Sequence, residues 1–449
     1  MATLKSSFFR SIAVLVGGTA IAQAISIAIL PIITRLYSPA DYSLYAVYVA
    51  IVQIVSVGAA LRFDVALNVP KRDVEAIGLL ILGLISSVII SGVSAILIAF
   101  FSNTVAEGLG RPDIEPYLWL VPCGIVVASW YSLFQYWAAR TKNFTLISRT
   151  RITQSVSSGG IQIGVGLISP SPIGLLLGHL LQTGAGIASL VQKFVKTDAR
   201  RMRLLRARRL RALFIRYRAF PLYSVAEATA QIGSLQLPLI IIAACAVGPE
   251  AGFLTLATRV SQAPIALLGG AVAQVFASNA GAALRAGNLR DLVLRTQRAL
   301  IKSAVGPMLF MALLSPSVCG LLFGDSWRRS GELIQWVMPG LIMQMLASAI
   351  GPIFYIKALQ QRAFSLQIFG LIFRVSAVAA AALLYKEWIA EVYAITGALF
   401  YLCYWVLCIT AAGESFWPII RGLRGSFLFP LCWVVLGLMA HFVFTSLLF

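Results

Sequence analysis

Long apolar stretches separated by short polar turns recur along the whole chain. Each stretch has about 20 residues or more, which is the length that a helix needs to cross the hydrocarbon core of a bilayer. The pattern predicts thirteen membrane-spanning helices, at residues 9–34, 42–66, 75–101, 116–138, 145–168, 172–192, 219–247, 251–282, 299–323, 333–357, 363–384, 388–412 and 426–448. The fifth is the weakest, because it contains SVSSGGIQIGVGLIS. We therefore predict an all-α polytopic membrane protein.

Composition agrees with this class. The chain has 449 residues, of which 59% are hydrophobic and 12% charged, whereas soluble domains carry about 25% charged residues. The first apolar run continues beyond the cleavage-like AQA at 22–24, so we expect an uncleaved first span. The six cysteines lie in apolar stretches without a CxxC pair, and His179 and His441 are isolated. The sequence therefore predicts no metal site and no cofactor.

Basic residues predict the orientation of the chain. Lys and Arg collect in the cytoplasmic loops of membrane proteins. With the N-terminus in the cytoplasm, 29 of the 36 basic residues fall in the loops or at the span ends of the cytoplasmic side and five on the other side. We therefore predict a cytoplasmic N-terminus.

The most basic segment, 193–218, holds 11 Lys or Arg and one acid. We interpret it as a cytoplasmic loop, largely helical, on anionic membrane lipids, since each cation near an anionic leaflet gains about 1 kcal/mol. Apolar residues are available to touch the headgroups: Leu204, Leu205, Leu210, Leu213 and Phe214. No nucleic-acid-binding module accompanies the segment, so we expect no nucleic-acid partner.

The same segment separates two halves that resemble each other. Two stretches correspond: AQAISIAILPIITRLYSPADYSLYAVY in the first half and AQIGSLQLPLIIIAACAVGPEAGFLTLATRV in the second. In this alignment Pro31 corresponds to Pro238 and Pro39 to Pro249. We predict two pseudo-symmetric six-helix lobes, 1–192 and 219–413, joined by the linker 193–218 and followed by a linker and an extra helix at 414–449. Both lobes begin in the cytoplasm, so the repeat is parallel, and a site is expected between its halves.

Ionisable residues inside spans are the candidate site residues, because they are costly in a bilayer and usually face a cavity. Arg259, Arg374 and Glu227 lie within spans, and the pair Arg62 and Asp64 lies at the inner end of the second. Simpler interpretations stay open. Arg62 and Asp64 would be an interfacial anchor pair, Arg374 would extend to the interface, and Glu227 would form a structural ion pair with Arg259. The same holds for Glu391, which would be interfacial.

No motif of a known enzyme class is present. The chain has no GxSxG, Walker A, HExxH or DxD motif, and its predicted outer loops are too short for a catalytic domain. We therefore predict a transporter without catalytic residues. A cavity lined by arginines would suit a pyrophosphate or an acidic sugar.

Four stretches resemble the bacterial polysaccharide-repeat flippases, the Wzx-type transporters of O-antigen and exopolysaccharide. They are RLYSPADYSLYAVYVAIVQI, LRFDVALNVPKRDVEA, GPEAGFLTLATRVSQAPIALLGGAVAQVF and FGDSWRRSGELIQWVMPG. The resemblance covers residues 5–360. These flippases belong to a wider superfamily that also includes multidrug exporters and the peptidoglycan-precursor flippase. Ser43 replaces the usual glycine, Asp64 replaces the usual glutamate, and the extra last span departs from an even number of spans.

The resemblance implies a function. Two lobes would rock to move an undecaprenyl-pyrophosphate-linked oligosaccharide from the cytoplasmic to the outer leaflet of the bacterial inner membrane, for lipopolysaccharide or exopolysaccharide synthesis. The substrate would meet Arg259, Arg62 and Arg374, with Arg35 near the outer mouth. Glu227 or Asp64 would carry a coupling proton. The polysaccharide polymerase and chain-length machinery would be protein partners.

Three other functions remain open. A multidrug or organic-cation antiporter would share the fold, but it would need an acidic cavity. A membrane polymerase or ligase would need a large outer loop. The peptidoglycan-precursor flippase fits the quoted stretches less well.

Overall fold

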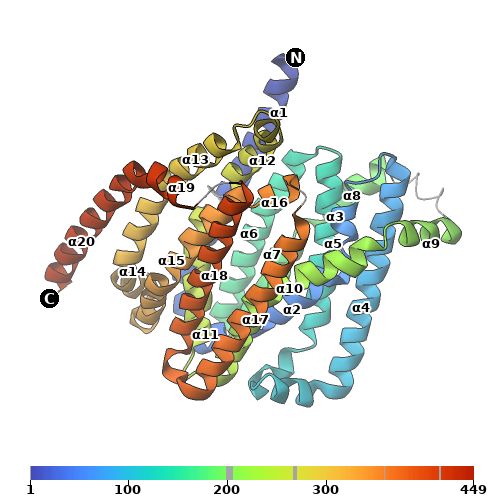
Figure 1. Ribbon diagram of the computed structural model, residues 1–449. Coiled ribbons are helices and arrows are strands. Elements are labelled where there is room, and N and C mark those ends of the chain that lie inside the picture. The colour runs from blue at the N-terminus through green and yellow to red at the C-terminus, as the bar shows by residue number, and fades with distance from the viewer. Residues whose placement is uncertain (1, 199–205, 266–269, 358, 414–415, 449) are drawn as a thin grey trace. The chain divides into compact units, whose positions relative to one another are not determined.

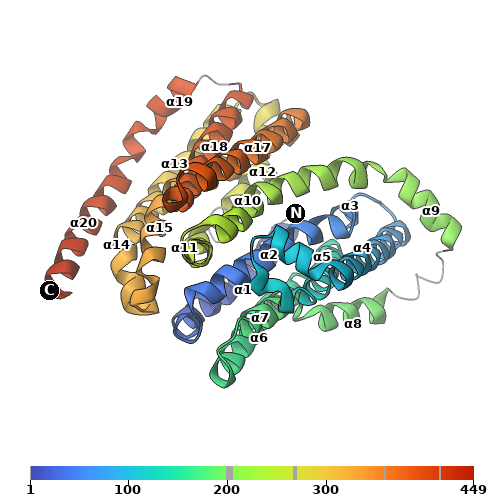
Figure 2. The same cartoon turned by 90° about the horizontal axis from the view of Figure 1, so that it is seen from below.

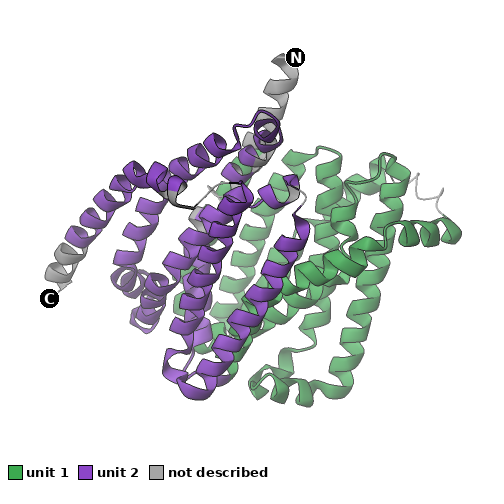
Figure 3. Cartoon of the chain, in the orientation of Figure 1, with its two compact units in different colours: residues 1–244 green, residues 245–449 purple. Residues whose placement is uncertain are grey.

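The structure is a computed structural model that describes residues 2–198, 206–265, 270–357, 359–413 and 416–448. These residues form helices joined by turns, and no strand occurs among them (Figure 1). The chain divides into two compact units, residues 1–244 and 245–449, which Figure 3 shows in separate colours. The predicted all-α class is confirmed.

Unit 1 is built around α5, which contacts α2, α4 and α7, while α6 lies between α1 and α7 (Figure 2). Its helices are α1 (Ala2–Leu36), α2 (Pro39–Ala59), α3 (Phe63–Ala66), α4 (Asp73–Gly108), α5 (Leu120–Arg140), α6 (Phe144–Ile168), α7 (Ile173–Gly184), α8 (Ile187–Thr197), α9 (Ala207–Arg216) and α10 (Val225–Cys245), the last of which ends at the boundary.

The turn between α1 and α2 shows how the sequence sets a helix boundary. Ser38 Oγ accepts a hydrogen bond from the Asp41 backbone N–H at 3.2 Å, and Asp41 Oδ2 accepts one from the Ser38 backbone N–H at 2.8 Å. This reciprocal capping box satisfies two backbone donors that a helix start leaves free. Pro39 follows at the first helical position, where its missing N–H costs nothing.

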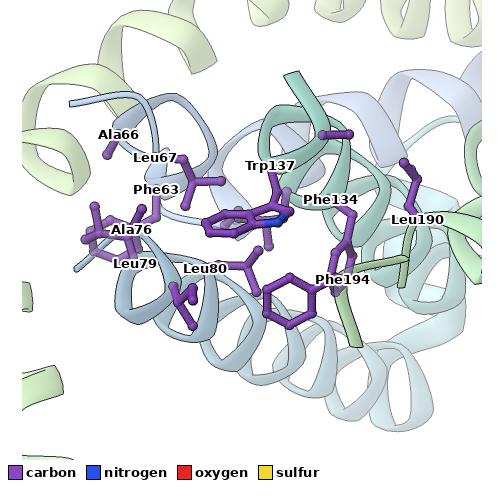
Figure 4. Packing of buried hydrophobic residues seen from close by; sticks show 14 of the residues in the cluster. Phe63, Ala66, Leu67, Ala76, Leu79, Leu80, Phe134, Trp137, Leu190 and Phe194 are labelled. Carbon is purple, nitrogen blue, oxygen red and sulfur yellow. The ribbon is translucent and has the colours of Figure 1, made fainter. Parts of the chain in front are cut away.

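A hydrophobic cluster holds α3, α4, α5, α8 and α9 together at one end of unit 1 (Figure 4). Trp137 lies within it, 4% exposed, and its ring meets the ring of Phe194 edge to face at 5.5 Å. Leu213 of α9 is also buried in this cluster. Leu213 therefore attaches α9 to the protein interior.

We expect Trp137→Ala to lower the free energy of unfolding by about 3–5 kcal/mol, because truncating a buried aromatic ring leaves a cavity. Trp119→Ala is the matched control, since Trp119 directly precedes the first residue of α5 and is 56% exposed. Thermal unfolding of the purified protein in detergent measures both. Equal losses in the two variants would contradict the packing described for the cluster.

Unit 2 is centred on α15, which contacts α11, α14 and α18. Its helices are α11 (Glu250–Pro264), α12 (Gly270–Arg285), α13 (Leu289–Leu300), α14 (Gly306–Phe323), α15 (Arg328–Ile350), α16 (Ile353–Ile356), α17 (Gln360–Leu384), α18 (Ile389–Ala411), α19 (Phe416–Leu423) and α20 (Leu428–Leu448). A Cβ on Gly331 would collide with the backbone of Ser315 and Pro316, so this glycine permits the close approach of α15 to α14. Ser315 Oγ uses the proximity to donate to the Gly331 carbonyl at 2.7 Å.

Helices occur at all thirteen predicted spans. Among the described residues, nine helical segments are long and apolar enough to cross a membrane: Val16–Leu36, Pro39–Ala59, Asp73–Gly108, Ile173–Thr197, Phe220–Cys245, Leu289–Phe323, Asp325–Ile350, Gln360–Leu384 and Lys386–Ala411. The other four predicted spans correspond to α5, α6, the α11–α12 region and α20. In α6 the two arginines at its start, Arg149 and Arg151, lower its apolar character. Residues 266–269, within the predicted span 251–282, lie outside the described residues.

The compact units divide the chain after α10, whereas the sequence placed the lobe boundary at 193–218. Two hydrogen bonds link α10 to other parts of unit 1. Gln236 Nε2 donates to Gln53 Oε1 on α2 at 2.7 Å, and Arg111 Nη1 donates to the Ala243 carbonyl at 3.4 Å. The pseudo-symmetry of two six-helix lobes and the cytoplasmic N-terminus stay predictions.

Within the basic segment, α8 and α9 are helical, as expected. The placement of Leu213 against headgroups was wrong, because this side chain is 5% exposed and lies in the hydrophobic cluster. Phe214 is 39% exposed and meets the ring of Phe63 at 5.9 Å. Leu204 and Leu205 lie outside the described residues.

Candidate functional site

A pocket of about 220 Å³ lies in unit 1, where α2 ends and α3 begins. Its polar lining is Gln53, Ser56, Arg62, Asp64, Ser129 and Ser132, from α2, the α2–α3 turn, α3 and α5. The turn is unusual, because Leu61 and Arg62 both adopt positive φ, 51° and 57°. Residues other than glycine rarely adopt this conformation, and where it persists it is often part of a functional site.

Asp64 is the buried charge of this pocket, 6% exposed. Its Oδ2 accepts a hydrogen bond from Ser132 Oγ at 2.8 Å, its Oδ1 accepts one from the Val65 backbone N–H at 2.9 Å, and Arg62 Nη1 lies 3.9 Å from Oδ2. Arg62 Nε is buried and donates to no acceptor among the described residues. The burial of Asp64 disagrees with the alternative that Arg62 and Asp64 only anchor the chain at the membrane interface.

Ser132→Ala is expected to lower the free energy of unfolding by about 1.5–3 kcal/mol, the usual value of a hydrogen bond to a charged group. Ser129→Ala is the matched control, because Ser129 Oγ donates only a long bond, 3.4 Å, to the Ser56 carbonyl. Thermal unfolding of both variants gives the comparison. A Ser132→Ala protein as stable as the wild type would show that this bond contributes little to holding Asp64.

Arg374 is buried in unit 2, 2% exposed, on α17. Its guanidinium carbon lies 5.1 Å from the centre of the Tyr393 ring on α18, while its Nε and Nη1 are buried without an acceptor among the described residues. The alternative that this side chain extends to the interface was wrong. Leu384, where α17 ends, is ten residues away, on the order of 15 Å along the helix.

A cluster that the sequence analysis missed lies in unit 2, and we call it the Arg329 cluster: Arg329, Glu250, Glu332 and Glu391. Arg329 Nε lies 3.2 Å from Glu250 Oε1, Nη1 lies 3.1 Å from Glu332 Oε2, and Nη2 lies 2.5 Å from Glu391 Oε1. The three glutamates come from the N-terminal parts of α11, α15 and α18. Glu391 is 4% exposed, and its expected position at the membrane interface stays a prediction.

The remaining predicted site residues lie on other helices. Arg35 is exposed in the last turn of α1, and Glu227 is half-buried in the first turn of α10, both in unit 1. Arg259 is half-buried on α11 of unit 2, and its Nη1 is buried without an acceptor among the described residues. Of the six predicted residues, the structure brings together Arg62 and Asp64. Substrate-binding and ion-coupling roles for all six stay predictions.

The fold is similar to those of known transporters. The structure titled "Lipid II flippase MurJ, inward closed conformation" matches with a TM-score of 0.68 and 14% identity, over 97% of this chain and 98% of that one. An inward-facing multidrug resistance MATE family transporter of the MOP superfamily matches with a TM-score of 0.59 and 14% identity, over 89% of this chain and 93% of that one. A MOP superfamily transporter from Pyrococcus furiosus, whose title notes a reversed polarity of its binding pocket, gives 0.58 and 14%, over 90% and 96%.

Sequence comparison gives the family. A search of the curated proteins gives no match. The family model described as "Polysaccharide biosynthesis protein" matches residues 32–332, more than half of the chain. With its apolar helices and its MurJ-like and MATE-like fold, the chain is a multi-pass membrane protein. It belongs to the polysaccharide biosynthesis protein family.

Proposed function

We propose that this protein flips a polyprenyl-pyrophosphate-linked oligosaccharide repeat unit from the cytoplasmic to the outer leaflet of the bacterial inner membrane. The observation that carries the proposal is the family match over residues 32–332. The fold shared with a lipid II flippase supports it, because that protein is also described as a flippase. The product would enter a surface polysaccharide, either O-antigen or exopolysaccharide.

The charges inside the helices support an anionic substrate. Arg374 and Arg259 have buried guanidinium nitrogens without acceptors among the described residues, and Arg62 has another. Arginine suits pyrophosphate, because its planar fork of donors binds two oxygens at once. In this proposal Arg259, Arg62 and Arg374 meet the pyrophosphate during alternating access, Arg35 attracts it at the outer mouth, and Glu227 or Asp64 carries a coupling proton.

Reconstituted vesicles test the substrate class. Purified protein is placed in vesicles with a fluorescent polyprenyl-pyrophosphate oligosaccharide, and the fraction that a membrane-impermeant quencher reaches is followed with time. We expect the wild type to move the labelled lipid between leaflets, while protein-free vesicles do not. Transport of an organic cation without movement of the labelled lipid would reject the proposal and favour a multidrug antiporter of the same fold.

A further inference from the structure

The Arg329 cluster holds more negative than positive charge. Three carboxylates surround one guanidinium. The Glu332 side chain is 47% exposed, so water screens its charge, but the side chains of Glu250 and Glu391 are 13% and 5% exposed. Two carboxylates therefore share one arginine in a largely buried place, which leaves one negative charge without a partner when both are ionised.

One oxygen of Glu391 gives independent evidence of a binding site. Glu391 Oε1 contacts Arg329 Nη2, whereas Oε2, on the same carbon, is buried and accepts no hydrogen bond from any residue that the structure describes. A buried acceptor without a donor is unfavourable, and more so when it is charged. A ligand that brings positive charge to this oxygen would remove that penalty.

The observations favour a proton over a metal ion as this ligand. Among the described residues, no group of three His, Cys, Asp or Glu side chains is arranged to hold a metal ion. Burial raises the pKa of the Glu250 carboxyl, and the charges of Glu391 and Glu332 raise it further, although the Arg329 guanidinium acts to lower it. When two neighbouring carboxylates cannot both be ionised without a large electrostatic cost, the pair takes up one proton.

We propose that Glu250 and Glu391, held by Arg329, form a proton-binding site in unit 2. A proton from water adds to a carboxylate oxygen of one of the two glutamates. The buried pair then carries one negative charge, which Arg329 balances, and loss of the proton to water restores the charged state. Glu332, beside the site, is half-exposed. The charge pattern of the sequence assigns this end of unit 2 to the outer side.

Other charged groups near these elements do not remove the imbalance. Asp325 and Arg328 precede or begin α15, and Lys386 and Glu387 precede α18; all four are exposed to solvent. Arg374, on α17, faces the Tyr393 ring of α18. Among the residues that the structure describes, the ion pairs of Arg329 are with the three glutamates of the cluster.

Infrared difference spectroscopy tests the proton site on the full chain, in detergent, without any substrate. A titration from about pH 8 to about pH 4 covers ordinary and raised glutamate pKa values. We expect the band of a protonated buried carboxyl to grow in the wild type and to persist in Glu332→Gln. It should be lost in Glu391→Gln and separately in Glu250→Gln, since either change leaves one carboxylate balanced by Arg329.

Two results would overturn the proposal. One is a band that persists unchanged in both Glu250→Gln and Glu391→Gln. The other is a band in the wild type that sodium chloride suppresses and choline chloride does not, because the site would then take a metal cation in place of the proton. Gel filtration and thermal unfolding show which variants are folded. If only one of the two glutamine variants folds, an unchanged band in that variant overturns the proposal. The measurement needs no flipping, so its failure leaves the proposed function untouched.

Discussion

Arg374→Met is expected to make the protein more stable and to make it a poorer flippase. An arginine near the centre of a span costs about 2.5–3.5 kcal/mol on insertion scales. The contact with the Tyr393 ring returns on the order of 2 kcal/mol when it is desolvated. Desolvation therefore outweighs the cation–π contact, and methionine fills much of the same space without a charge. We expect a gain of about 1 kcal/mol in the free energy of unfolding.

The same variant is expected to lose most of its flipping in reconstituted vesicles, since a buried charge that lowers stability is retained for function. Arg362→Met is the matched control, because Arg362 is exposed on the same helix, and it should change neither property much. Thermal unfolding and the quencher assay are done on the same preparations. If Arg374→Met unfolds more easily than the wild type, Arg374 has a structural role in joining α17 to α18.

Arg329→Gln should have the opposite effect on stability, and a larger one. Removing one partner of a buried ion pair costs about 3–5 kcal/mol, because the remaining charge stays buried without compensation. Here two largely buried carboxylates, Glu250 and Glu391, lose their counter-charge together. We expect α11, α15 and α18 to separate at this end, and the unfolding temperature to fall by several degrees.

Arg328→Gln provides the matched control for this variant. Arg328 is the preceding residue, it is exposed, and it carries the same charge. Its substitution should change the unfolding temperature little, because a surface charge contributes about 0–1 kcal/mol. Acidic conditions give a second comparison, since protonation of the glutamates should reduce the loss in Arg329→Gln. Similar stability of the two variants at neutral pH would contradict the role assigned to Arg329.

Local features of the fold could be predicted from the sequence. Apolar runs predicted the helices. The predicted second span began at 42, whereas α2 begins at Pro39; SPAD holds the local signal for that start, because Ser38, Pro39 and Asp41 act within one turn. The grouping of α10 with unit 1 could not be predicted, since it depends on contacts between residues far apart, such as Gln53 and Gln236. A repeat in the sequence does not indicate which other helices a given helix contacts.

The candidate site was predictable only in part. Arg62 and Asp64 are two residues apart, so their pairing in one pocket could be predicted from their spacing. The Arg329 cluster could not, because Glu250, Arg329 and Glu391 are brought together by the packing of three helices. In the sequence each lies near the predicted end of a span, where a charge is unremarkable. The acid after Pro249 and the pair Arg328–Arg329 were the available signals.

The most direct test of the central claim uses a strain of the source bacterium that lacks this gene and any related one. The lipid-linked oligosaccharide is labelled from each side of the inner membrane to find the leaflet on which it accumulates. We predict accumulation on the cytoplasmic leaflet, relieved by the wild-type gene and not by an equally expressed Arg374→Met variant. Normal surface polysaccharide in the deletion strain, with no accumulated lipid-linked oligosaccharide, would contradict the account.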